Sequence, residues 1–315
     1  MRRLYRTAFV ILFFCTLSVF AKDKPGFWGS FVNFFVPHAE KREVLLSKQT
    51  QYFQVSVEED SRGLRHLVFK PVKGSQGIWN PKKPDDIISN SCKYLILFMT
   101  MIDHPPERVL FIGLGAGIVP RFVGKHFSGV IIDIVEIDPD IPKIAHKYFA
   151  YNKSAKTNII IGDGRDFINR TKHKYDLIFI DAYNAHSIPF QLTTQEFYSK
   201  VRNALTPQGI VAVNIANLGK AQFIASELKT IKSIFPYLSI YLCPGKSNYI
   251  PFASLEPQIS QDAQNKKADK IDSDLALNYK MKDIIETRMT KLEIKKITKN
   301  GIILTDDYAP VETMK

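Results

Sequence analysis

Short apolar runs alternate with amphipathic stretches through the middle of the chain. Each run is nearly continuous in Val, Ile, Leu and Phe, which is typical of a strand buried on both faces of a sheet. We expect strands at 109–112, 130–135, 158–161, 175–180, 209–215 and 238–242, with a last, antiparallel strand at 248–254. The stretches 194–205 and 219–235 carry helical periodicity. This alternation predicts an α/β fold with a doubly wound, mainly parallel sheet.

A glycine-rich turn follows the first of these runs. Three glycines stand there at alternate positions, namely Gly113, Gly115 and Gly117, and the second run ends on Glu136. Glycines let a ligand approach the backbone closely, and an acid after the second strand can accept the hydroxyls of a ribose. Ile118 replaces the third glycine of the dinucleotide fingerprint, so we expect a nucleoside site of another kind. The alternative is an ordinary strand–helix–strand unit whose glycines only form a tight turn.

Polar residues also end the next two predicted strands. Asp163 and Gly164 follow the run 158–161, and Asp181 follows the run 175–180. In a parallel sheet the carboxyl ends of the strands share one edge, where ligands bind. Asp181 is therefore a candidate general base, because such a group must lie within reach of the substrate. The alternative is a strand-end acid that is hydrogen-bonded to a neighbouring loop.

Period-two patterns occur nearer the N-terminus. Residues 51–57 and 64–72 alternate around a Ser61-Arg62-Gly63 turn, which predicts a hairpin. We therefore expect a small N-terminal β domain over residues 50–103 and a Rossmann-like nucleoside-binding domain over residues 104–312.

The region after the last predicted strand is charged and mixed. Asp274 is expected to cap a helix that reaches Leu292 and packs its apolar stripe on the core.

The first 21 residues have the pattern of a targeting segment. Arg2, Arg3 and Arg6 precede an apolar run over residues 8–21, which is short for a membrane span. The segment is either a signal peptide cleaved before Lys22 or a membrane anchor. We therefore expect an exported (periplasmic or secreted) or a membrane-anchored protein. Residues 22–49 are expected to form a linker with an aromatic, amphipathic segment.

Composition excludes several classes of partner. The 43 Lys and Arg residues outnumber the 31 Asp and Glu residues, for a net charge of +12, but the basic residues are scattered and form no DNA-binding motif. We expect no nucleic-acid partner. The three cysteines, Cys15, Cys92 and Cys243, lack metal-ligand spacing, so we expect neither a metal site nor a disulfide framework.

Five motifs together resemble a known family. They are GLGAG at 113–117, VEIDP at 135–139, GDGRDF at 162–167, IDAYNAHSIPFQLTTQEF at 180–197 and LTDDYAPVE at 304–312. The set is similar to the spermidine synthase (polyamine aminopropyltransferase) superfamily, and most of all to its spermidine synthase-like branch. The resemblance covers roughly residues 50–312. It implies a class I methyltransferase fold with a small N-terminal β domain, in a homodimer or homotetramer.

The resemblance also implies roles for single residues. Gln76 and the glycine turn would contact the donor, Glu136 its ribose, and Asp163 and Gly164 its adenine. Asp181 would match the proton-accepting aspartate of the family. The donor would be S-adenosylmethionine or its decarboxylated form, and the acceptor a small-molecule amine.

Two departures from the family pattern concern the acceptor. Ala116 and Asn184 occupy positions where the family carries acids, and a buried ammonium without a carboxylate partner is costly. A diamine is therefore disfavoured, unless Asp306 and Asp307 reach the acceptor pocket instead of forming a turn before Pro310. We expect an aminopropyl transferase acting on an amine. The alternatives are an S-adenosylmethionine-dependent methyltransferase and a non-catalytic nucleoside-binding protein.

Overall fold

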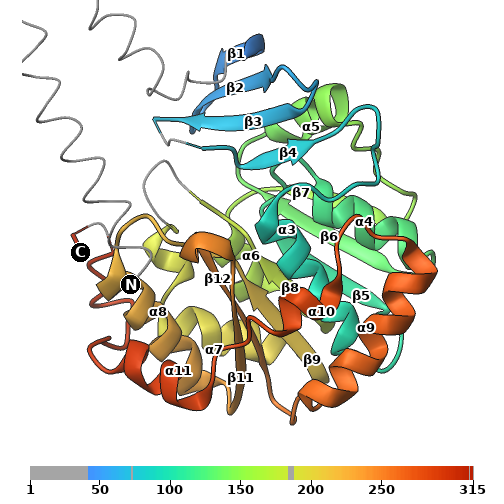
Figure 1. Cartoon of the computed structure of the whole chain (residues 1–315). Helices are drawn as coiled ribbons and strands as arrows, with labels where there is room; N and C mark the ends of the chain where they lie inside the picture. Colours follow the sequence, from blue (N-terminus) through green and yellow to red (C-terminus); the bar gives the residue numbers. More distant parts are fainter. Residues whose placement is uncertain (1–41, 72–73, 184–187, 312, 315) are drawn as a thin grey trace, which may run out of the picture. The chain divides into compact units, whose positions relative to one another are not determined.

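The computed structural model describes residues 42–71, 74–183, 188–311 and 313–314, in which the backbone forms two sheets (Figure 1). The expected targeting segment 1–21 and most of the expected linker 22–49 lie outside the described residues. None of the described helices combines the length and the apolar character that crossing a bilayer requires.

The smaller sheet is antiparallel and has the order β1-β2-β3-β4. Its strands are β1 (Glu43–Gln49), β2 (Gln54–Glu59), β3 (Arg65–Lys70) and β4 (Gly77–Trp79). The predicted hairpin is confirmed as β2 and β3, with Gly63 at a positive φ of 78° in the turn. The sheet begins before residue 50, because β1 pairs with β2. As an edge strand with mostly exposed side chains, β1 shows no clear apolar alternation.

The larger sheet confirms the expected fold class. Five parallel strands lie in the order β9-β8-β5-β6-β7. They are β5 (Arg108–Ile112), β6 (Ile131–Glu136), β7 (Thr157–Ile161), β8 (Tyr175–Ile180) and β9 (Leu205–Val213). The chain moves from β5 outward to β7 and then returns to the other side of β5 as β8. The topological switch point, where open α/β sheets bind ligands, is therefore at the carboxyl ends of β5 and β8.

Antiparallel strands complete the sheet beyond β9. They are β10 (Ile215–Ala216), β11 (Tyr237–Leu242) and β12 (Asn248–Ser254). The expected last strand is confirmed, because β12 runs antiparallel to β9 and to β11.

Helices cover both faces of the larger sheet. They include α3 (Asn90–Leu95) with the 3-10 turn η1 (Ile96–Thr100), α4 (Ile118–His126), α5 (Ile141–Phe149), α6 (Gly164–Arg170), α7 (Gln195–Ala204) and α8 (Ala221–Ile234). Neighbouring residues of β5 belong to different cores: Phe111 packs with side chains of α3, α4 and α5, and Ile112 with those of α7 and α8. Burial on both faces explains why β5 is continuously apolar.

The C-terminal region differs from its prediction. It contains α9 (Gln261–Leu275), α10 (Met281–Ile285) and α11 (Lys291–Thr298) instead of one helix beginning at Asp274. Ala276 ends α9 in the left-handed conformation, at a φ of 46°. Met281 of α10 is buried as expected, but Leu292 is 75% exposed. The prediction that the apolar stripe packs on the core was therefore wrong at its last residue, Leu292.

Candidate active site

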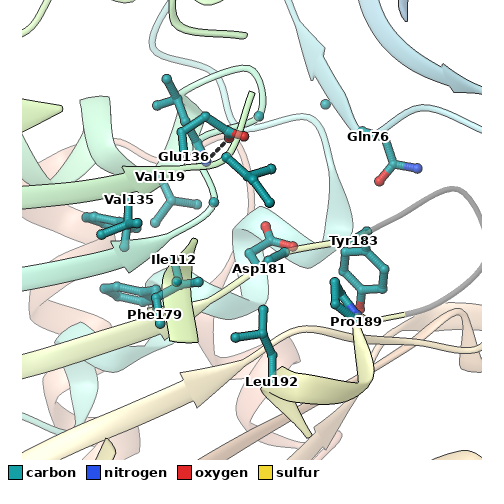
Figure 2. Close-up of a pocket in the computed structure, with 18 of the residues that line it drawn as sticks. Gln76, Ile112, Val119, Val135, Glu136, Phe179, Asp181, Tyr183, Pro189 and Leu192 are labelled. Atoms are coloured by element: carbon teal, nitrogen blue, oxygen red, sulfur yellow. Dashed lines mark hydrogen bonds between the residues drawn. The ribbon is translucent and has the colours of Figure 1, made fainter. Parts of the chain in front are cut away.

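A cavity of about 450 Å³ lies at the carboxyl ends of β5, β6, β7 and β8 (Figure 2). All but one of the site residues expected from the sequence line it, namely Gln76, Gly113, Gly115, Glu136, Asp163, Gly164 and Asp181. The structure thus brings together residues that are separated by up to a third of the chain. Their individual roles remain predictions.

The glycine turn allows β5 and β8 to approach each other closely. Gly113 has a φ of 97°, and a methyl group on it would lie 2.3 Å from the carbonyl oxygen of Asp181. Gly117 is the exception among the expected residues, because it does not line the cavity. It begins α4 at a φ of 72° with the ring of Tyr151 against it, where a methyl group would lie 2.6 Å from a ring carbon. The structure therefore shows a packing contact for Gly117 and places it outside the cavity lining.

Glu136 is held rigidly at the end of β6. One carboxylate oxygen accepts the N–H of Leu114 at 2.9 Å, and the other accepts the N–H of Asp138 at 3.0 Å. Burial raises the pKa of this carboxyl, and the two backbone hydrogen bonds oppose that shift. Each oxygen keeps a second lone pair, so the carboxylate can still accept from the hydroxyls of a ribose.

Asp163 and Gly164 form the start of α6 beside the cavity. Asp163 caps the helix, since one of its carboxylate oxygens accepts the N–H of Asp166 at 3.0 Å. Gly164 packs on Ile112, where a methyl group would lie 2.5 Å from a side-chain carbon. The positive end of α6 therefore faces the ligand space.

Gln76 reaches the cavity from the smaller sheet. Its backbone N–H donates to the carbonyl of Leu67 at 2.7 Å, which holds the loop before β4 against β3. Figure 2 shows its side chain above Tyr183, on the opposite side of the view from Glu136. The smaller sheet therefore supplies part of the wall of the site.

Asp181 is oriented by two asparagines that the sequence analysis did not single out. Asn214 donates its side-chain N–H to Asp181 at 2.8 Å, and Asn248 donates to the side-chain oxygen of Asn214 at 2.8 Å. Burial raises the pKa of Asp181, and the hydrogen bond from Asn214 opposes the shift. The available signal was Asn214 itself, a polar residue inside the apolar run 209–215.

Tyr183 forms the wall beyond Asp181. Its hydroxyl donates to the backbone carbonyl of Asn214 and accepts the N–H of Ala216 at 2.6 Å. Burial raises its pKa well above the usual value, so the phenol stays protonated. The next residues, 184–187, lie outside the described residues, and they include Asn184.

The C-terminal acids do not reach the cavity. Asp306 accepts from Arg165 at 2.5 Å and from the hydroxyl of Thr194 at 2.6 Å. The same arginine donates to the carbonyl of Gln191 at 2.9 Å. Neither Asp306 nor Asp307 lines the cavity, so the turn before Pro310 is the correct alternative. Asp306 and Arg165 instead fix the segment that carries the 3-10 turn η2 (Phe190–Leu192).

Ala116 lines the cavity but has little room around it. Its side chain is 3% exposed, and Gly77 of β4 lies directly against its methyl group, so that a methyl on Gly77 would come within 2.6 Å. The small side chain of Ala116, in the turn after β5, therefore packs against a glycine of the smaller sheet. Within the described ranges, no group of three or more His, Cys, Asp or Glu side chains could hold a metal ion.

Comparisons with known proteins agree with this geometry. Residues 90–256 match the family model described as the spermine/spermidine synthase domain. The chain is 28% identical over 291 residues to the polyamine aminopropyltransferase of Vibrio vulnificus, covering 89% of this chain and 94% of that protein.

Methyltransferases are also similar. The human eEF1A lysine and N-terminal methyltransferase is 32% identical over 186 residues, which is 53% of this chain but 26% of that protein. The crystal structure of human methyltransferase-like protein 13 in complex with SAH matches with a TM-score of 0.55 at 28% identity, over 61% of this chain and 95% of that chain.

Proposed function

This chain belongs to the spermine/spermidine synthase domain family of transferases, and from that premise we propose that it binds an S-adenosyl nucleoside and transfers an aminopropyl group to an amine. One observation carries the proposal. Gly113, Glu136, Asp163 and Asp181 surround a single cavity at the switch point of the sheet. Apolar packing does not require acids at the ends of these strands, whereas a nucleoside site uses an acid at a strand end to accept the ribose hydroxyls.

The donor site is divided among three strand ends. Glu136 accepts the ribose hydroxyls, the start of α6 at Asp163 and Gly164 contacts the adenine, and the glycine turn lets the sulfonium lie close to β5. When bound, the sulfonium supplies an electrophilic carbon. The methyltransferase structure with SAH supports this class of donor, because a similar chain of the same fold holds an S-adenosyl nucleoside.

Asp181 and positioning supply the catalysis. The acceptor ammonium gives one proton to Asp181, whose pKa is raised by burial, so that it is a stronger proton acceptor than an exposed aspartate. The freed nitrogen lone pair forms the new N–C bond while the C–S bond breaks, and that bond's electron pair stays on sulfur. Holding nitrogen, carbon and sulfur in line provides most of the acceleration in such a displacement.

A methyltransferase is the second candidate, and Ala116 is the observation that favours it. The cavity lacks the family acid at this position, and the human relative is named for methylating a lysine and an N-terminus, both amines. The same cavity, with S-adenosylmethionine as the donor, would then deliver a methyl group to the nitrogen near Asp181.

Calorimetry followed by product analysis tests both candidates. The full-length protein is titrated with S-adenosylmethionine, its decarboxylated form and methylthioadenosine, and then incubated with each donor and a mixture of amines. Release of methylthioadenosine supports aminopropyl transfer, and release of S-adenosylhomocysteine supports methyl transfer. Asp181→Asn should keep donor affinity and lower turnover by about 10²–10⁴-fold. Donor binding without either product would support a non-catalytic nucleoside-binding protein.

A further inference from the structure

We propose that the acceptor is a primary amine with one positive charge, whose non-reacting end is apolar. This inference rests on the proposed function and narrows it. A polyamine precursor such as a diamine would carry a second ammonium, and the described lining of the cavity offers that group no carboxylate of its own.

The acids of the cavity are unevenly distributed. Among the described lining residues they are Glu136, Asp163 and Asp181. Glu136 and Asp163 end β6 and β7, on one side of β5, and Asp181 ends β8 on the other side. The donor nucleoside uses the first two in the proposed function. Asp181 alone is left for the acceptor.

The loop beyond Asp181 cannot add a second carboxylate. Residues 182–194 read AYNAHSIPFQLTT, so the sequence contains no Asp or Glu anywhere in this loop. Asp306, which accepts from Thr194 at the end of this loop, is also bound to Arg165 and lies outside the cavity. A second ammonium would therefore have no carboxylate partner among the described residues of this end of the cavity.

The remaining described wall at this end is mostly apolar, and Gln191 is its polar member. Ala182, Pro189, Phe190 and Leu192 line it. Tyr183 adds its ring, because its hydroxyl is already bonded to backbone groups of β10 and its neighbour. Figure 2 shows Tyr183, Pro189 and Leu192 on the side of Asp181 that faces away from Glu136. This surface suits a hydrocarbon tail.

An anionic tail is equally unsuited to the site. Of the cavity-lining residues in the described part of the chain, none is Lys, Arg or His. A carboxylate or phosphate on the acceptor would have no cationic partner among these described lining residues. The tail is therefore uncharged, and the single charge of the acceptor is the reacting ammonium beside Asp181.

Two amines of equal size test the inference. Pentylamine and 1,4-diaminobutane have the same number of heavy atoms and differ in one end, a methyl group against an ammonium. With the full-length protein and saturating donor, kcat/KM should favour pentylamine by at least about tenfold, because an unpaired buried charge is costly. Donor affinity is measured separately by calorimetry.

A charge introduced at the same wall should reverse the preference. Phe190 lines the cavity and is 51% exposed, so its replacement leaves the core intact. Phe190→Asp should shift the ratio of the two kcat/KM values toward the diamine by about tenfold or more relative to Phe190→Asn, its uncharged match.

The outcomes distinguish failure of the acceptor inference from failure of the proposed transferase function. A diamine used as well as or better than pentylamine overturns the acceptor inference and leaves the transferase proposal standing. Normal donor binding with turnover of neither amine also overturns it, and points to an acceptor presented by a macromolecule. Absence of donor binding overturns the proposed function itself, and the inference with it.

Discussion

Glu136→Gln should weaken nucleoside binding by at least about tenfold. The side chain keeps its shape, but one of its two oxygens becomes an NH₂ group that faces the N–H of Leu114 or Asp138. The variant therefore loses one acceptor for the ribose and the negative charge that strengthens the other. A hydrogen bond to a charged group is worth about 1.5–3 kcal/mol. The loss of one such bond corresponds to about a tenfold rise in Kd.

Stability should change less than affinity in this variant. The backbone N–H without an acceptor costs about 1–3 kcal/mol. Removal of a buried charge, whose pKa is raised by burial, offsets part of that cost. The two effects are separated by calorimetry for affinity and by thermal unfolding for stability.

A pH series adds a second readout. Because only the carboxylate form accepts two hydroxyls, wild-type affinity should fall as the pH falls through the raised pKa of Glu136, and this contribution should be missing in the glutamine variant. The exposed Glu107→Gln is the matched control. An unchanged Kd in a folded Glu136→Gln protein would refute the assignment of the ribose to Glu136.

Three further predictions concern the fold, the buried charge and the N-terminus. Gly113→Ala should lower the free energy of unfolding by more than about 3 kcal/mol in chemical denaturation, because its methyl group would meet the Asp181 carbonyl. Gly115→Ala, with open space around the glycine, should cost only about 1–2 kcal/mol. Equal losses in the two variants would contradict the close approach of Gly113 to Asp181. Glu227 is fully buried, and the hydroxyl of Tyr198 donates to its carboxyl. Burial raises the pKa of Glu227 well above 4.5. The stability of the wild type should therefore decrease as the pH rises from the pKa of Glu227 in the unfolded chain toward its pKa in the folded protein. Glu227→Gln should therefore gain melting temperature relative to the wild type as the pH rises, and a constant difference would show that the carboxyl is already ionised in the fold. N-terminal sequencing of protein from its own host should begin at Lys22 if the leader is cleaved, and an intact Met1 on soluble material would rule out both the signal and the anchor.

The sequence determined the sheet and the strand-end residues of the site. Strands of a parallel sheet must be apolar on both faces, so β5, β6 and β8 are visible as continuous runs. The residue after each run then lies at the shared edge of the sheet wherever the strand is placed. For this reason Glu136 and Asp181 could be identified before any contact was known.

Tertiary structure alone decided which residues support those side chains. Asn214 reaches Asp181 because β9 pairs with β8, and Asn248 reaches Asn214 because β12 pairs with β9 and β10. Arg165 meets Asp306 across 141 positions of the chain, and Gly77 meets Ala116 between two sheets. Local patterns of polarity encode which face of an element is buried. They do not encode which distant element covers that face, because strand order and sheet packing set that choice.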